Sequence, residues 1–175
     1  MALPKLTLVL GGARSGKSAL AEKLVLDTGK RPVYLASAQA FDDEMRARIA
    51  DHQAMRAGHG WETVEAPVEV TQPIAALAAD QAMLFDCATL WLSNVMLAER
   101  NVEAECARLL DALDNCRGRV VVVSNEVGLG VVPDNALARR FRDAQGVLNQ
   151  RIAERAGLVV AVMAGLPMVL KGQMP

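Results

Sequence analysis

Aromatic residues are scarce in this sequence, making up 3% of its 175 residues. Proteins that bind single-stranded nucleic acids stack the bases on aromatic side chains, and nucleic-acid-binding domains in general carry a basic surface. Here 19 basic residues face 20 acidic ones, for a formal net charge of −1. Both signatures are missing, so we expect no nucleic-acid partner.

Long apolar runs are missing as well. The longest apolar stretch extends from Ala156 to Leu170 and is interrupted by Gly157, Gly165 and Pro167. A membrane-spanning helix needs about 20 consecutive apolar residues. We therefore expect no membrane span, and we interpret this stretch as a buried strand followed by a turn.

Cysteine is rare, and the spacing of the cysteines is not that of a disulfide framework or a zinc site. The three cysteines are an odd number and show no C-x-x-C pattern, which argues against a disulfide framework or a zinc site. They are Cys87, Cys106 and Cys116. Buried reduced thiols in a cytoplasmic protein are the expected state.

The sequence does contain a regular alternation of short apolar runs and longer helical patterns. Strands are expected near Leu6–Leu10, Val33–Ala36, Trp61–Val64, Met83–Phe85, Val120–Ser124 and Leu158–Met163. Helices are expected near Lys17–Thr28, Asp42–Arg56, Val70–Ala79, Thr89–Glu99, Glu103–Cys116 and Ala136–Arg155. This alternation predicts an α/β fold with a mainly parallel sheet and helices on both faces. No linker or repeat divides the chain, so residues 1–175 are expected to form a single domain.

A phosphate-binding pattern follows the first predicted strand. Its eight residues, which match G-x-x-x-x-G-K-[ST], are Gly11, Gly12, Ala13, Arg14, Ser15, Gly16, Lys17 and Ser18. Glycines let backbone N–H groups approach phosphate oxygens, and the start of the following helix adds partial positive charge. Lys17 is expected to reach the β- and γ-phosphates, and the Ser18 hydroxyl to bind Mg²⁺. The alternative is a plain strand–turn–helix corner.

Ligands of such sheets bind beyond the carboxyl ends of the strands, so the residues there are candidates. Asp86 ends an apolar strand and would hold Mg²⁺, or else cap the helix that follows it. Asn125 and Glu126 would position a water, a hydroxyl or the metal, or simply form a turn. Ser37 would contact a nucleotide or start a turn.

The predicted helix Asp42–Arg56 carries a second candidate site. Arg48, His52 and Arg56 are four residues apart and therefore share one ridge of the helix. Two guanidinium groups beside an imidazole suit a polyphosphate and disfavour protonation of the ring. Met45 lies on an adjacent stripe, however, so His52 could equally be a histidine at the edge of a packed face.

Several of these patterns coincide with those of one protein family. They are the loop 11–18, the helix 42–56, the strand 61–65, Asp86-Cys87, the run Ser124-Asn125-Glu126-Val127-Gly128-Leu129-Gly130 with its continuation to Asn135, and the segment 141–150. Together they resemble the bifunctional adenosylcobinamide kinase / adenosylcobinamide-phosphate guanylyltransferases of cobalamin biosynthesis. The resemblance covers nearly the whole chain, and the Asn-Glu-Val-Gly-Leu-Gly run is its most specific part.

The resemblance implies a two-step activity. A nucleoside triphosphate, ATP or GTP, phosphorylates the hydroxyl of adenosylcobinamide. GTP then transfers GMP to an active-site histidine, and the phosphate of adenosylcobinamide phosphate takes up the GMP to give adenosyl-GDP-cobinamide. The family fold is a P-loop NTPase domain with a recombinase-type core, assembled as a homotrimer, and the small-molecule substrate is a corrinoid.

The resemblance also assigns residues. The guanylylated histidine falls on His52, four residues before Arg56. Besides the phosphate loop, nucleotide contacts fall on Ser37, Arg56, Glu65 and Asp86. Some members carry Glu where this chain has Asp86, which shortens the reach of the carboxylate by one methylene.

Two other functions remain to be separated from this one. The first is a P-loop small-molecule kinase or ATPase without histidine chemistry. The second is a GTP-binding switch, but the sequence contains no Asn-Lys-x-Asp motif for guanine, and Asp86 is not followed by x-x-Gly.

Overall fold

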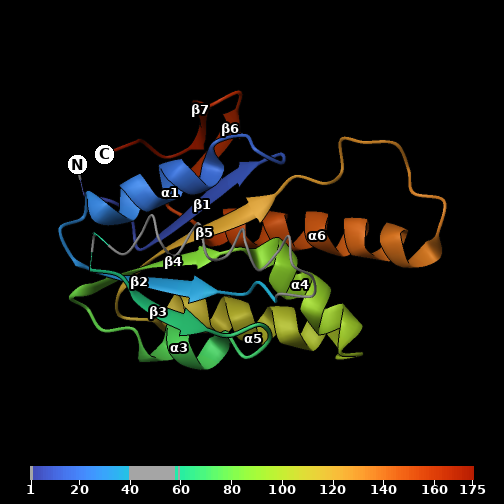
Figure 1. The fold of residues 1–175 in the computed structure, drawn as a ribbon, viewed down its shortest axis with the longest axis horizontal. Coiled ribbons are helices and arrows are strands. Elements are labelled where there is room, and N and C mark those ends of the chain that lie inside the picture. The colour runs from blue at the N-terminus through green and yellow to red at the C-terminus, as the bar shows by residue number, and fades with distance from the viewer. Residues whose placement is uncertain (1, 40–57, 59) are drawn as a thin grey trace.

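The computed structural model describes residues 2–39, 58 and 60–175. Its centre is a seven-stranded sheet with the strand order β3-β2-β4-β5-β1-β6-β7 (Figure 1). The strands are β1 (Leu6–Gly11), β2 (Arg31–Ala36), β3 (Glu62–Glu65), β4 (Gln81–Asp86), β5 (Arg119–Asn125), β6 (Leu158–Met163) and β7 (Leu166–Lys171). Strands β1 to β6 pair in parallel, and β7 is antiparallel to β6. The expected mainly parallel sheet is confirmed.

Helices cover both faces of the sheet. The described helices are α1 (Lys17–Leu26), α3 (Thr71–Ala76), α4 (Ala88–Leu97), α5 (Val102–Asn115) and α6 (Ala136–Arg155). Helix α1 lies on one face, and α3 to α6 form the layer on the other (Figure 1). The sheet therefore has a hydrophobic core on each side.

Strand β5 belongs to both cores because successive side chains of a strand point to opposite faces. Val120 and Val122 pack with the residues of α4 to α6, whereas Val121 and Val123 pack with those of α1. All four valines are fully buried. An uninterrupted run of β-branched residues is therefore what a central strand with two covered faces requires.

Three of the described helices begin at a side-chain cap, whereas the short α3 and α1, which starts at the phosphate loop, do not. Asn101 and Asn135 accept hydrogen bonds from the backbone N–H groups of the third residues of α5 and α6, at 3.0 and 2.7 Å. Cys87 Sγ does the same for α4. Helix α1 starts after Gly16, with no side-chain cap and no acidic residue in its first turn. Its first N–H groups are therefore left to another acceptor.

The stretch from Ala156 to Leu170 is the main place where the expectation was wrong. A strand and a turn are present, but the chain returns as a further strand, β7, after the two residues Ala164 and Gly165. Both have positive φ, 51° and 78°, as a tight hairpin turn requires. Every residue of β7 is exposed, including Leu166, so β7 is not part of the buried strand that we expected.

The other expected elements are present with small shifts. Helix α3 ends at Ala76 rather than Ala79, and β3 is displaced by one residue toward the carboxyl end. The predicted helix Asp42–Arg56 lies outside the described residues. All three cysteines are buried and free, as expected. Within the described ranges, no helix is both long enough and apolar enough to cross a bilayer.

Candidate nucleotide site

The predicted phosphate-binding sequence forms the connection between β1 and α1. Two of its residues adopt positive φ, Arg14 at 53° and Gly16 at 95°. Gly11 is needed for a different reason, because a Cβ at this position would lie 2.7 Å from Val162 O and would also collide with Ser15 Oγ. The start of the loop is therefore packed tightly between Ser15 and the backbone of β6.

The turn between β6 and β7 supports this loop from the side. Gly165 N donates a hydrogen bond to Ser15 O at 2.9 Å. A Cβ on Gly16 would lie 3.2 Å from Gly165 Cα, so the two backbones approach closely. Residues near the two ends of the sequence together fix the shape of the loop.

The uncapped start of α1 and the side chain of Lys17 make this loop a site for an anion. Free N–H groups at a helix N-terminus bind phosphate through hydrogen bonds and the helix dipole. Lys17 Nζ donates a hydrogen bond to Gly12 O at 3.0 Å, so the ammonium group folds back over the loop. The positive charge therefore lies over the N–H groups that would bind a phosphate.

Asp86 lies at the carboxyl end of β4, with β5 between β4 and β1. Adjacent strands are about 4.8 Å apart, so the ends of β4 and β1 are separated by about 10 Å. Tyr34 donates its phenolic O–H to Asp86 Oδ2 at 3.2 Å, which orients the half-buried carboxylate.

The ionisation of Cys87 reports on the charges around it. Burial raises the pKa of its thiol to about 11, and the negative charge of Asp86 adds to this shift, whereas the positive charge of Lys17 opposes it. Both charged groups therefore lie near the end of β4. This agrees with the topology, in which the phosphate loop and Asp86 follow strands that flank β5.

The donor set fits Mg²⁺ bound mainly by phosphates. Mg²⁺ commonly takes one or two protein oxygens and completes its shell with waters and substrate phosphates. Ser18 supplies a hydroxyl at the start of α1, and Asp86 supplies a carboxylate. In the described part of the chain, no cluster of three or more His, Cys, Asp or Glu side chains forms a protein-only metal site.

Ser37 follows β2, and its side chain is engaged within the protein. The hydroxyl is fully buried, donates to Cys87 O at 2.8 Å and accepts from Cys87 N at 2.9 Å. Asn94 Nδ2 donates to Ser37 O at 2.8 Å and to Pro67 O at 3.0 Å. Ser37 thus fastens the end of β2 to the end of β4, which positions Asp86.

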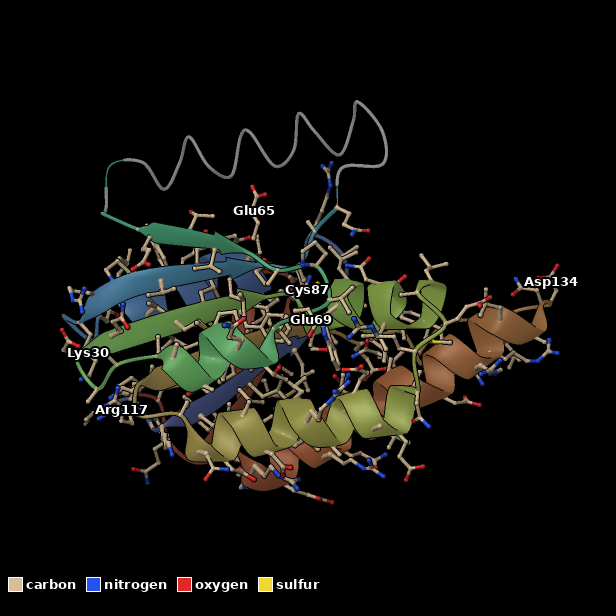
Figure 2. All side chains as sticks on the ribbon, turned by 90° about the horizontal axis from the view of Figure 1, so that it is seen from below. Lys30, Glu65, Glu69, Cys87, Arg117 and Asp134 are labelled. Carbon is tan, nitrogen blue, oxygen red and sulfur yellow. The ribbon has the colours of Figure 1, made fainter. Side chains whose placement is uncertain are left out.

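Glu65 ends β3 and lies opposite Ala36, as Asp86 does on the other side of β2. Figure 2 shows its exposed side chain standing out from β3 on the side away from α5. Four strand spacings separate β3 from β1, or about 19 Å, so a ligand that reached both Glu65 and the phosphate loop would have to extend along the sheet edge.

A pocket of about 630 Å³ opens beside Glu65. Its walls come from the end of β3, the following loop and α3. They are formed by Gln39, Val64, Glu65, Ala66, Pro67, Val68, Glu69, Gln72, Pro73 and Ala76. The pocket is mostly apolar and lies at the same edge of the sheet as the strand ends described above.

Of the predicted site residues, the structure brings together the phosphate loop and Asp86, and it places Ser37 and Glu65 along the same sheet edge. His52, Arg48 and Arg56 lie outside the described residues. Three residues that are buried beside Ser124 at the end of β5 were not predicted: Thr89, Gln145 and Asn149. Two of them could have been found from their spacing, since Gln145 and Asn149 are four residues apart on α6 and therefore lie on the same face of the helix.

The fold and the loop define a P-loop NTPase. Among solved structures, the RadB recombinase is similar with a TM-score of 0.54 and 17% identity, over 91% of this chain and 74% of that chain. The type III secretion ATPase EscN from enteropathogenic E. coli is similar with a TM-score of 0.58 and 9% identity, over 92% of this chain and 43% of that chain. At these identities the likeness concerns the fold alone.

Sequence similarity identifies the family within this class of proteins. The family model described as cobinamide kinase / cobinamide phosphate guanyltransferase matches residues 7–170, and the chain belongs to this family. The resemblance stated from the motifs is confirmed.

Two curated relatives are similar over almost their whole length. The bifunctional adenosylcobalamin biosynthesis protein CobP of Pseudomonas aeruginosa is 48% identical over 169 residues, covering 95% of this chain and 97% of the relative. The bifunctional adenosylcobalamin biosynthesis protein CobU of Salmonella typhimurium is 41% identical over 180 residues, covering 94% and 98%. The family and its bifunctional members are enzymes that carry out two reactions.

Proposed function

We propose that this protein phosphorylates adenosylcobinamide and then transfers GMP to the product, acting as a single P-loop domain. The observation that carries the proposal is the placement of the phosphate loop and Asp86 at the carboxyl ends of β1 and β4, which lie on either side of β5 at the same edge of the sheet. This arrangement suits a magnesium–triphosphate complex, and the chain belongs to a family described by both activities.

In the first reaction, the hydroxyl oxygen of the corrinoid side chain attacks the γ-phosphorus of ATP or GTP. The new O–P bond forms as the bond to the β,γ-bridging oxygen breaks, the proton of the attacking hydroxyl passes to water, and the nucleoside diphosphate leaves. Lys17 and the N–H groups of residues 12–18 hold the phosphates and stabilise the charge that develops on their oxygens. Mg²⁺, held by Ser18 and Asp86 together with the phosphates, would neutralise part of the same charge.

In the second reaction, the imidazole of His52 attacks the α-phosphorus of GTP. A P–N bond forms, pyrophosphate leaves, and the resulting phosphoramidate carries GMP. An oxygen of the corrinoid phosphate then attacks this phosphorus, the P–N bond breaks, and the histidine is restored. A covalent intermediate of this kind divides one displacement into two easier ones.

Nucleotide contacts outside the phosphate loop are assigned to Ser37, Arg56, Glu65 and Asp86. For Ser37 the buried hydroxyl supports a positioning role, because both of its hydrogen bonds go to Cys87. For Glu65 the exposed carboxylate beside the pocket supports a contact remote from the triphosphate. We also propose a homotrimer; the exposed apolar side chains of β7 offer unburied surface for it, and light scattering would test it.

The deciding experiment is labelling of the full-length protein with α-³²P-GTP. The chain has two histidines, His52 and His59. The wild type and His59→Ala should acquire an acid-labile label that co-migrates with the protein, whereas His52→Ala should acquire none. Phosphorylation of cobinamide by γ-³²P-ATP and γ-³²P-GTP is measured in parallel and should survive in both variants.

A label that persists in His52→Ala would show that this histidine is not the residue that carries GMP. A wild type that phosphorylates cobinamide but never becomes labelled would be a P-loop small-molecule kinase without histidine transfer. A wild type that does neither would contradict the proposed function.

A further inference from the structure

Tyr34 lies in β2, next to the strand that ends in Asp86, and it is the only tyrosine in the chain. In the register of these two strands, Ala36 pairs with Asp86 and Tyr34 pairs with Leu84. Side chains two residues apart in a strand, and those of register partners, point to the same face of a sheet. Tyr34 and Asp86 therefore share the face that is covered by α1, which begins at Lys17.

The ring of Tyr34 is confined by its surroundings. The residue is only 8% exposed and packs in the core between the sheet and α1. Trp61, which precedes β3, meets the ring edge-on, with the ring centroids 6.3 Å apart and the planes at 87°. This T-shaped arrangement is one of the favourable geometries for an aromatic pair. A ring confined in this way brings its O–H to a defined point at the end of β4.

That point is one oxygen of the Asp86 carboxylate. Tyr34 Oη donates a hydrogen bond to Asp86 Oδ2 at 3.2 Å in a partly buried place. A hydrogen bond to a charged acceptor is stronger than one to a neutral acceptor, and partial burial reduces the competition from water. Carboxylates that bind metals are commonly hydrogen-bonded by neighbouring groups, and these partners tune the affinity for the metal. Tyr34 is such a partner for the carboxylate that we assign to Mg²⁺.

The number of oxygens that a carboxylate offers affects which metal it binds best. Mg²⁺ is small, requires a near-octahedral shell and is held by one or two carboxylates together with waters and phosphates. Ca²⁺ is larger, accepts more oxygens in a flexible shell and readily takes both oxygens of one carboxylate. A carboxylate that has one oxygen engaged by a phenol is therefore better suited to Mg²⁺ than to Ca²⁺.

We propose that Tyr34 is a positioning residue that determines the choice of metal: its hydrogen bond makes Asp86 bind through a single oxygen and so favours Mg²⁺ over Ca²⁺ in the nucleotide complex. The inference rests on the proposed function, in which Asp86 and Ser18 hold the metal together with the phosphates. It adds a metal preference to that site and assigns the preference to a side chain that acts through the carboxylate. Tyr34 neither gives nor takes a proton in the two transfer reactions.

The test measures nucleotide affinity by equilibrium dialysis in Mg²⁺, in Ca²⁺ and in EDTA, without a corrinoid. The nucleotide is a GTP analogue with a methylene group in place of the α,β-bridging oxygen, so that pyrophosphate cannot leave. The binding of each metal to the free nucleotide is the same whichever variant is present, so differences between variants report contacts with the protein. Tyr34→Phe should lower the affinity in Mg²⁺ about tenfold or more, with little change in Ca²⁺ or in EDTA.

Two further variants locate the effect. Trp61→Phe is the matched control, because it alters the ring that packs against Tyr34 but leaves the phenolic O–H in place. Its preference for Mg²⁺ over Ca²⁺ should equal that of the wild type. Asp86→Asn should lose the preference, and in that background Tyr34→Phe should have no further effect, because two residues that act as one unit are not additive.

Three results would overturn the inference. The first is a wild type that binds the nucleotide equally well in Mg²⁺ and Ca²⁺. The second is a Tyr34→Phe variant that keeps the wild-type ratio of the two affinities. The third is a Tyr34→Phe variant that weakens binding by the same factor in Mg²⁺, Ca²⁺ and EDTA, because a purely structural role would act in this way. Thermal melting checks that each variant is folded.

A second measurement needs no substitution and decides the question if Tyr34→Phe does not fold. Because the chain has a single tyrosine, incorporation of 3-fluorotyrosine gives the full-length protein one ¹⁹F resonance, at the ring of Tyr34. Replacing Mg²⁺ by paramagnetic Mn²⁺ in the nucleotide complex should broaden this resonance strongly, because a metal at Asp86 would lie next to the phenol. A resonance that stays sharp would overturn the inference.

Both measurements are independent of the corrinoid, so they separate this inference from the proposed function. A protein that prefers Mg²⁺ through Tyr34 but fails to phosphorylate cobinamide would contradict the proposed function and leave the inference standing. A protein that phosphorylates cobinamide but binds nucleotide with the same metal preference in the wild type and in Tyr34→Phe would contradict the inference alone.

Discussion

Replacing Gly11 by alanine should destabilise the protein even when no nucleotide is present. The new Cβ would lie 2.7 Å from Val162 O and would also collide with Ser15 Oγ. The serine side chain can rotate away, but Val162 O is backbone in β6, which pairs with β1 at this register. Relief requires β1 and β6 to separate at the carboxyl end.

The size of the effect follows from this contact. Overpacking by one carbon in a rigid place costs about 1–3 kcal/mol in the free energy of unfolding. Gly12→Ala is the matched control, since nothing lies within 4 Å of a Cβ at Gly12 and its φ is not in the left-handed region. The free energy of unfolding of that variant should remain within about 1 kcal/mol of the wild-type value. Replacing glycine by alanine even favours the folded state, because it lowers the conformational entropy of the unfolded chain.

Urea unfolding of the ligand-free proteins, followed by circular dichroism, makes the comparison. With a slope of about 2 kcal/mol per molar urea, a loss of about 2 kcal/mol lowers the midpoint by about 1 M. Equal midpoints for Gly11→Ala and Gly12→Ala would refute the reasoning. Gly11 would then be needed only for the approach of the phosphate.

Two further predictions concern the strand ends around Asp86. Ser37→Ala should lower the free energy of unfolding by about 1–3 kcal/mol, because both of its hydrogen bonds to Cys87 are buried; a variant of wild-type stability by urea unfolding that has lost nucleotide affinity would instead show a direct contact. Burial raises the pKa of the Cys87 thiol from its ordinary 9.0 to about 11, so the unfolded chain loses this proton first and stability should fall as the pH rises from 9 to 11. Urea midpoints measured across this range should fall more steeply for the wild type than for Cys87→Ala, and parallel curves would contradict the assignment.

The order and type of the described elements could be predicted from the sequence because hydrophobic periodicity is strong in this chain. The run Val120–Val123 has no polar position, and this predicted a strand with two covered faces, as the two cores show. Strand β7 was missed for a physical reason. Pro167 argues against an internal strand, but β7 is an edge strand, where a missing N–H is tolerated.

The candidate site was predictable to the extent that it depends on a local pattern. The phosphate loop is contiguous in sequence, and Asp86 could be found because it ends an apolar run. The hydrogen bonds of Ser37 to Cys87, in contrast, join residues from different strands, and no local pattern reports them. The buried contacts of Thr89, Gln145 and Asn149 with Ser124 were not predicted, because these residues come from three elements and meet only when α4 and α6 pack on β5.

The hydrogen bond from Gly165 to Ser15 has a consequence for synthesis of the protein. The phosphate loop is made early, but the backbone that fixes its shape comes from β6 and the hairpin turn, which follow all the other described elements except β7. A chain emerging from the ribosome therefore carries the complete phosphate-binding sequence long before it has a finished loop. The loop therefore reaches its fixed shape only after the β6–β7 turn has been synthesised.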